Sequence, residues 1–117
     1  MSFAHERLDV YQCALSHLAL ALRIVEGLPR GHGFLADQLR RAALSVPLNI
    51  AEGVGRPGED DRRRHFAIAR GSATECAAVL DAARTLGVLD EAAVAEGKRL
   101  LERIVAMLTK LGARPGG

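Results

Sequence analysis

Apolar residues recur at spacings of three and four along four stretches of the chain, which is the period of an amphipathic α-helix. Short segments rich in glycine separate these stretches. The pattern predicts helices over about residues 9–26, 34–54, 59–86 and 90–112. No stretch alternates apolar and polar residues as a half-buried strand does. Because long helices joined by short loops pack beside one another, we expect one all-α domain over residues 1–117, an antiparallel up-down-up-down four-helix bundle.

Pro47 lies in the middle of the second predicted helix. A proline there removes a backbone donor and costs roughly 3 kcal/mol. The apolar spacing nevertheless continues on both sides of it, so we predict a single helix kinked at Pro47. The kink would free a carbonyl near Ala43, which Asn49, Arg41 or a neighbouring chain could satisfy. A tolerated kink with solvated polar residues explains the sequence equally well, and both interpretations stay open.

Three predicted helices carry apolar residues outside the face expected in the core. These second rows contain Leu20 and Ile24 in the first helix and Leu44, Leu48 and Ala51 in the second. The row of the third helix contains the apolar Ile68 and Val79 with the polar Ser72 and Glu75 between them. Leu22 is expected in the core stripe of the first helix. A single bundle would leave the second rows in water, so we expect a homo-oligomer that covers them. Scattered exposed leucines are also ordinary, which keeps a monomer as the alternative.

Composition and charge set broad limits on the function. The chain has 117 residues, 49% of them hydrophobic, and a formal net charge of +2. These values fit one folded domain, and the charge alone is too small to predict nucleic-acid binding. No apolar run approaches the ~20 residues of a membrane span, and the start of the chain lacks a signal-peptide pattern. The two cysteines, Cys13 and Cys76, are expected as buried reduced thiols, which favours a cytoplasmic location.

A basic cluster, Arg62, Arg63 and Arg64, occupies the start of the third predicted helix, where the helix dipole disfavours cations. The acidic residues 59–61 could neutralise it through pairs one helical turn apart. In a symmetric homo-oligomer, however, the cluster and nearby Arg56 would be repeated in every copy, so that together they could contact phosphates. Such binding to RNA or DNA would be salt-sensitive and weakly sequence-specific.

Charged and amide side chains on the second and third helices are expected to pair across helices or subunits and to fix their register. They are Arg41, Asn49, Glu52, Arg70 and Glu75. A catalytic site needs a nucleophile with a base, or an acid–base pair in a pocket, and the sequence shows neither. Asp61 and His65 lie one turn apart but are too few for a metal site. We therefore expect no enzymatic activity, no cofactor and no metal.

Two segments resemble a known family. LRRAALSVPLNIAEGVGR (residues 39–56), followed by FAIARGSATE (residues 66–75), resembles the bacterial four-helix bundle proteins whose genes occur in intervening sequences of 23S ribosomal RNA. LDVYQCA (residues 8–14) also fits, with Tyr11 where the family usually has Trp. The resemblance spans about residues 8–112. Val46 for the usual Ile and the arginine-rich tract before the phenylalanine are its other departures.

The resemblance implies a ring-shaped homopentamer and no established enzymatic activity. More distant relatives, the accessory variability proteins of diversity-generating retroelements, are basic pentamers that work with a reverse transcriptase and bind nucleic acid. Two functions therefore stay open: backbone-directed binding of RNA or DNA through the basic cluster and Arg56, as an accessory to a nucleic-acid enzyme, or a scaffold for a protein partner. The residues expected in the oligomer interface or its polar network are Arg41, Leu44, Leu48, Asn49, Glu52, Ile68, Arg70, Ser72, Glu75 and Val79.

Overall fold

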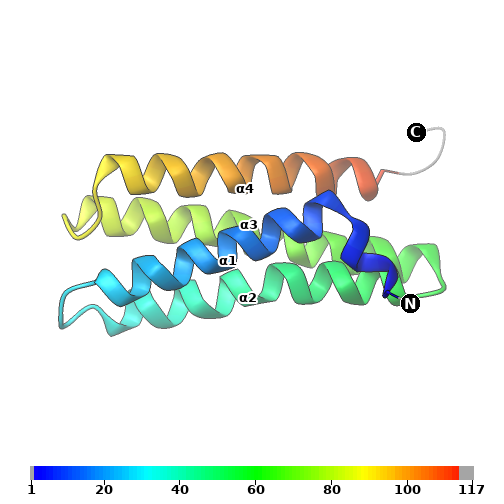
Figure 1. The fold of residues 1–117 in the computed structure, drawn as a ribbon, viewed down its shortest axis with the longest axis horizontal. Helices are drawn as coiled ribbons and strands as arrows, with labels where there is room; N and C mark the ends of the chain where they lie inside the picture. The colour runs from blue at the N-terminus through cyan, green and yellow to red at the C-terminus, as the bar shows by residue number, and fades with distance from the viewer. Residues whose placement is uncertain (1, 114–117) are drawn as a thin grey trace.

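The computed structural model describes residues 2–113. A short 3-10 helix, η1 (Ala4–Arg7), precedes four α-helices, which are α1 (Asp9–Gly27), α2 (Gly33–Gly55), α3 (Glu59–Thr85) and α4 (Glu91–Leu111). Within the described residues there is no β-strand, as the apolar spacing predicted. The helices lie along the long axis of the molecule, whose extents are 46 × 33 × 21 Å (Figure 1).

The connections between helices gather at the two ends of the bundle. The α1–α2 and α3–α4 connections lie at one end, and the α2–α3 connection lies at the other end with the N-terminus (Figure 1). Gly31 (φ 91°) and Gly87 (φ 75°) supply the left-handed backbone that the first two of these turns require. Asp90 caps α4, since its side chain accepts a hydrogen bond from the Ala93 amide at 2.8 Å.

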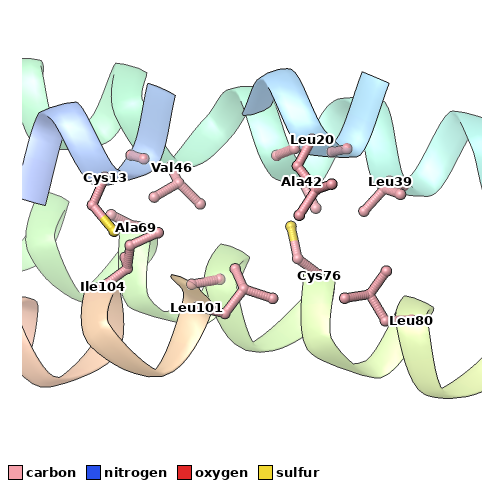
Figure 2. Close-up of a cluster of buried hydrophobic side chains, with 14 of the residues drawn as sticks. Cys13, Leu20, Leu39, Ala42, Val46, Ala69, Cys76, Leu80, Leu101 and Ile104 are labelled. Carbon is pink, nitrogen blue, oxygen red and sulfur yellow. The ribbon is translucent and has the colours of Figure 1, made fainter. Parts of the chain in front are cut away.

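The core runs through the middle of the bundle and draws side chains from all four α-helices (Figure 2). Leu20 comes from α1, Val46 from α2, Leu80 from α3 and Ile104 from α4, and all four are buried. Eight of the 24 buried hydrophobic residues in the described part of the chain are alanines, and the only aromatic ring among them is Phe66. Small side chains at so many core positions let the helices approach closely.

At two glycines a side chain or the backbone of a neighbouring helix comes close. A Cβ at Gly53 would lie 2.7 Å from the Phe66 ring and 3.2 Å from the backbone oxygen of Arg62, so α2 meets the backbone of α3 there. A Cβ at Gly97 would lie 2.5 Å from Cδ1 of Leu80, which is fully buried between α3 and α4. Both positions therefore have no room for a side chain.

The face of α1 that packs in the core differs from the predicted one. Leu20 and Ile24, expected outside the core, are 6% and 9% exposed, whereas Leu22, expected inside it, is 41% exposed. The reason is that Cys13 and His17 are also buried in α1, and they turn the core face toward their side of the helix. His17 is polar by residue type but 1% exposed, so the predicted apolar stripe of α1 was wrong.

Helix α2 continues without interruption through Pro47, whose side chain is buried. Neither of the two side chains considered for the freed carbonyl of Ala43 binds it. The Asn49 amide donates to the carbonyl of Ser45 at 2.9 Å, and Arg41 donates to the Gln38 side chain at 2.9 Å. That part of the prediction is wrong, because Asn49 stands one helical turn from the Ser45 carbonyl and its short side chain bends back to it.

Candidate functional site

Besides Phe34 in the first turn of α2, three large apolar side chains are exposed on the outer surface of α2 and α3. Leu44 is 47% exposed, Leu48 is 56% exposed and Ile68 is 40% exposed. Leu44 and Leu48 are four residues apart, so they form one row along α2. This row lies on the side of α2 opposite its core residues, as the sequence predicted. We call the surface formed by Leu44, Leu48, Ile68 and the polar side chains between the two helices the α2/α3 outer face.

A chain of hydrogen bonds connects α2 to α3 on this face. The Asn49 amide donates to Ser45 Oγ at 3.1 Å, and Asn49 Oδ1 lies 3.0 Å from Nδ1 of His65. The Ser72 hydroxyl donates to Ser45 Oγ at 2.8 Å. Because Asn49 Oδ1 can only accept, Nδ1 of His65 carries the proton. The four side chains form the Ser45–Asn49–His65–Ser72 cluster, which sets the register between the two helices.

His65 and Ser45 belong to this cluster although neither was among the residues expected in the polar network. His65 is the one that the sequence pattern could have revealed. It is 8% exposed, and its Nε2 has no hydrogen-bond partner among the described residues. The signal was its spacing: His65 and Ser72 are seven residues apart and therefore share one face of α3. Ser45 and Asn49 are four apart on α2, so both pairs follow the seam between the helices.

Two residues of α2 that were expected in the polar network have partners on their own helix instead. Arg41 is exposed and bonds to Gln38, and Glu52 pairs with Arg56 at 3.0 Å. Both contacts join residues three or four apart along α2. Within the single chain these side chains therefore do not connect α2 to another helix.

The remaining candidates of α3 divide between two faces. Arg70 donates to the Thr109 hydroxyl of α4 at 3.4 Å, so it lies toward α4 and away from the α2/α3 outer face. Glu75 is exposed and has no hydrogen bond or ion pair within residues 2–113. Val79 is partly buried and packs against the core. Among the predicted network residues, the structure brings together only Asn49 and Ser72, through Ser45.

The basic cluster lies at the end of the bundle that holds the α2–α3 connection (Figure 1). Arg56 pairs with Glu52 and, at 3.6 Å, with Asp61, whose other oxygen lies 3.5 Å from Arg64. Such exposed pairs contribute at most about 1 kcal/mol each. They nevertheless place a carboxylate beside each of these guanidinium groups.

The other two arginines of the cluster differ from each other. Arg63 pairs with Glu59 at 3.6 Å and also with Asp60. The side chain of Arg62 has no hydrogen bond or ion pair within the described part of the chain, and the residue is only partly exposed. Arg62 is thus the one arginine of the cluster whose charge no described carboxylate offsets.

Three buried titratable groups lie in the core, away from the α2/α3 outer face. Burial lowers the pKa of His17 to about 4. It raises the pKa of Cys76 to about 12, with the neighbouring Glu75 carboxylate adding to the effect. It also raises the pKa of Cys13, whose thiol lies 3.7 Å from the Leu100 carbonyl. All three groups are held in their neutral forms near pH 7.

Contacts between the third and fourth helices are electrostatic at the surface. Lys98 of α4 reaches Asp81 of α3 at 2.5 Å, and Arg84 reaches the same carboxylate at 3.0 Å. The hydrogen bond from Lys98 holds the pKa of Asp81 below its ordinary value.

Over residues 2–113, no three His, Cys, Asp or Glu side chains gather closely enough to bind a metal ion.

None of the helices in the described residues combines the length and the apolarity that crossing a membrane demands.

Comparison with curated proteins gave no match. A family model described as 23S rRNA-intervening sequence protein matches residues 6–110. This range includes the Pro47 segment and the α2/α3 outer face, and it confirms the resemblance found in the sequence. Because the match covers most of its length, the chain belongs to the family of 23S rRNA-intervening sequence proteins.

Proposed function

We propose that the protein is a non-enzymatic, homo-oligomeric helical bundle that acts as an interaction scaffold, and that its copies associate through the α2/α3 outer face. The exposure of Leu44, Leu48 and Ile68 around a half-buried polar cluster carries this proposal. Interface cores combine apolar side chains with a few aligned polar groups, and this face has both.

The exposed area of these three side chains would stabilise an oligomer once it is covered. Each is 40–56% exposed, and full burial of a Leu or Ile side chain contributes roughly 1.5–3 kcal/mol. Covering the remaining area would therefore contribute on the order of 1 kcal/mol per side chain in each copy. The Ser45–Asn49–His65–Ser72 cluster holds α2 and α3 in register beneath them, so a partner would meet a preformed surface.

The proposal also includes the arrangement of the helices and the number of copies in the oligomer. We infer an antiparallel up-down-up-down bundle, since successive connections alternate between the two ends of the molecule (Figure 1). A bend of α2 at Pro47 would curve this helix, and a ring of five copies is what the resemblance to the family implies. The relation to accessory variability proteins and a cytoplasmic location remain predictions.

A second function, binding of the RNA or DNA backbone, is favoured by Arg62 alone. The four arginines first considered, Arg56 and Arg62 to Arg64, lie among four carboxylates, those of Glu52, Glu59, Asp60 and Asp61. Local charges of both signs therefore cancel, which weakens long-range attraction of phosphates. In a ring, one Arg62 per copy would remain to contact a backbone or to recruit a nucleic-acid enzyme.

The oligomer is tested by light scattering on the purified chain and two matched variants. We expect a mass about five times the 12.5 kDa of one chain for the native protein. Leu48→Glu should reduce the mass to one chain, because it places a charge in the interface. Leu22→Glu is the control, since Leu22 is similarly exposed on α1 but lies outside the α2/α3 outer face.

A native protein that scatters as a single chain at micromolar concentration would disprove the homo-oligomer. Equal dissociation by Leu22→Glu would show that the interface is elsewhere. Circular dichroism of each variant confirms that the subunit stays helical.

The choice between scaffold and nucleic-acid binding needs a filter-binding titration with mixed RNA and DNA at low salt. No retention supports the scaffold. Retention that Arg62→Glu removes and Arg64→Glu keeps would instead support backbone binding through Arg62, because Arg64 is already paired with Asp61.

A further inference from the structure

A cavity of about 420 Å³ opens at the end of the bundle where the α2–α3 connection lies. This volume is within the range of roughly 300–1,000 Å³ that is typical of small-molecule sites. Its apolar walls come from four parts of the bundle: Leu8 directly precedes α1, Val54 lies in the last turn of α2, Phe66 belongs to α3 and Leu111 ends α4. The cavity is therefore a product of the whole bundle.

Phe66 lines this cavity and packs tightly against a neighbouring helix. Its side chain is 6% exposed, and the ring packs against the backbone of Gly53, where no Cβ fits. A wall held by a helix–helix contact of this kind does not have to rearrange when a ligand enters.

The cavity also contains cationic side chains. Arg62 and Arg63 both line it, together with Glu59. Glu59 and Arg63 pair with each other at 3.6 Å, so their charges offset. The side chain of Arg62 has no ion-pair or hydrogen-bond partner among the described residues, and the residue is partly buried. The cavity thus presents one uncompensated positive charge beside apolar walls.

We propose that this cavity binds a small amphiphilic anion, a molecule with one carboxylate or phosphate group on an apolar body. The Arg62 guanidinium would bind the anionic group, and Leu8, Val54, Phe66 and Leu111 would cover the body. A bare inorganic anion gains nothing from the apolar walls, and an uncharged hydrocarbon leaves Arg62 without a counter-charge. The cavity is independent of the α2/α3 outer face, so its ligand and the oligomer can be tested separately.

The test uses octanoate as the probe. Acetate, which keeps the carboxylate without the long chain, and 1-octanol, which keeps the chain without the charge, are the comparison compounds. Isothermal titration calorimetry gives the affinity, and spectra of methyl-labelled Leu and Val residues locate the ligand. Octanoate should shift the methyl signals of Leu8, Val54 and Leu111 at millimolar concentration, and both comparison compounds should bind more weakly.

Arg62→Gln should weaken octanoate binding by about tenfold, the size expected for one charge-assisted hydrogen bond at a partly exposed site. The matched control is Arg64→Gln, which removes the same charge from the same helix but lies outside the cavity. Leu111→Gln, which alters a partly exposed wall, should also weaken binding.

Several results would overturn the proposal. Methyl shifts that are absent, or that fall on Leu44 and Leu48, would show that the cavity is not the site. Equal weakening by Arg62→Gln and Arg64→Gln would reduce the effect to general charge, and equal binding of 1-octanol would exclude an anchoring role for Arg62. Binding to phosphatidylglycerol vesicles without binding of dissolved octanoate would indicate a membrane surface in place of a free amphiphile.

Discussion

Protonation of His17 is expected to make the folded protein lose stability between pH 6.5 and pH 4. His17 lies in α1 and is 1% exposed, and its Nδ1 has no hydrogen-bond partner among the described residues. Burial disfavours the charged imidazolium and lowers the pKa of His17 from 6.5 to about 4. Below pH 6.5 the His17 imidazole is therefore protonated in the unfolded chain but stays neutral in the folded chain. The free energy of unfolding falls with pH until the folded pKa is reached.

The size of the effect follows from the two pKa values. One pKa unit corresponds to roughly 1.4 kcal/mol, so the full difference is about 3 kcal/mol for a folded pKa of about 4. Between pH 7.5 and pH 4.5 most of this amount is lost, about 2 kcal/mol. For a domain of this size, that is a large part of a typical total of 5–15 kcal/mol.

The assay is urea denaturation of the untagged protein at fixed concentration and at several pH values, compared with His17→Leu. The variant should lose about 2 kcal/mol less than the native protein between pH 7.5 and pH 4.5, since it lacks this proton site. At pH 7.5 it should be at least as stable, because an unsatisfied buried nitrogen has been removed. Parallel pH profiles of the two proteins would refute the reasoning, because other groups would then account for the pH dependence.

Two further predictions concern the core. Gly53→Ala should reduce the free energy of unfolding by about 1–2 kcal/mol, because the new methyl group meets the Phe66 ring. Gly71→Ala should raise it by up to about 1 kcal/mol, because the space around the Gly71 Cβ position is open. Urea denaturation should show changes of opposite sign for the two variants, and equal changes would contradict the prediction. Cys13 and Cys76 should not react with an aromatic disulfide reagent at pH 8 until urea unfolds the chain, since burial raises the pKa of both thiols. Rapid labelling of the native protein would show that the core opens.

The sequence predicted the four helices well, because each has a long apolar period bounded by glycine-containing turns. The continuity of α2 through Pro47 was also predictable, since Val46 and Ile50 keep the same face on either side of the proline. The face of α1 was not, because a buried His17 has the composition of a surface residue and the burial of a core residue. Periodicity cannot register such a side chain until packing is known.

Three apolar residues of the candidate site and two members of its polar cluster, Asn49 and Ser72, were predictable from the sequence. Leu44, Leu48 and Ile68 lie off the core period, and this was enough to expect them on the surface. The partners of charged side chains were less predictable, because long residues such as Arg70 can reach any of several neighbours, and here it reaches α4. The cavity at the bundle end was invisible to the sequence, since its walls come from elements far apart in the chain.

Because alanine is abundant at the helix contacts, the core tolerates smaller side chains at these positions but not larger ones. Trimming a position that already carries a single methyl group removes little volume, whereas enlarging it forces neighbouring helices apart. Ala14, Ala43, Ala69 and Ala73 are all fully enclosed, so a valine or leucine at any of them has nowhere to go. Natural variation in this protein should therefore accumulate on the outside of the bundle, while the inward rows drift only among the smallest side chains.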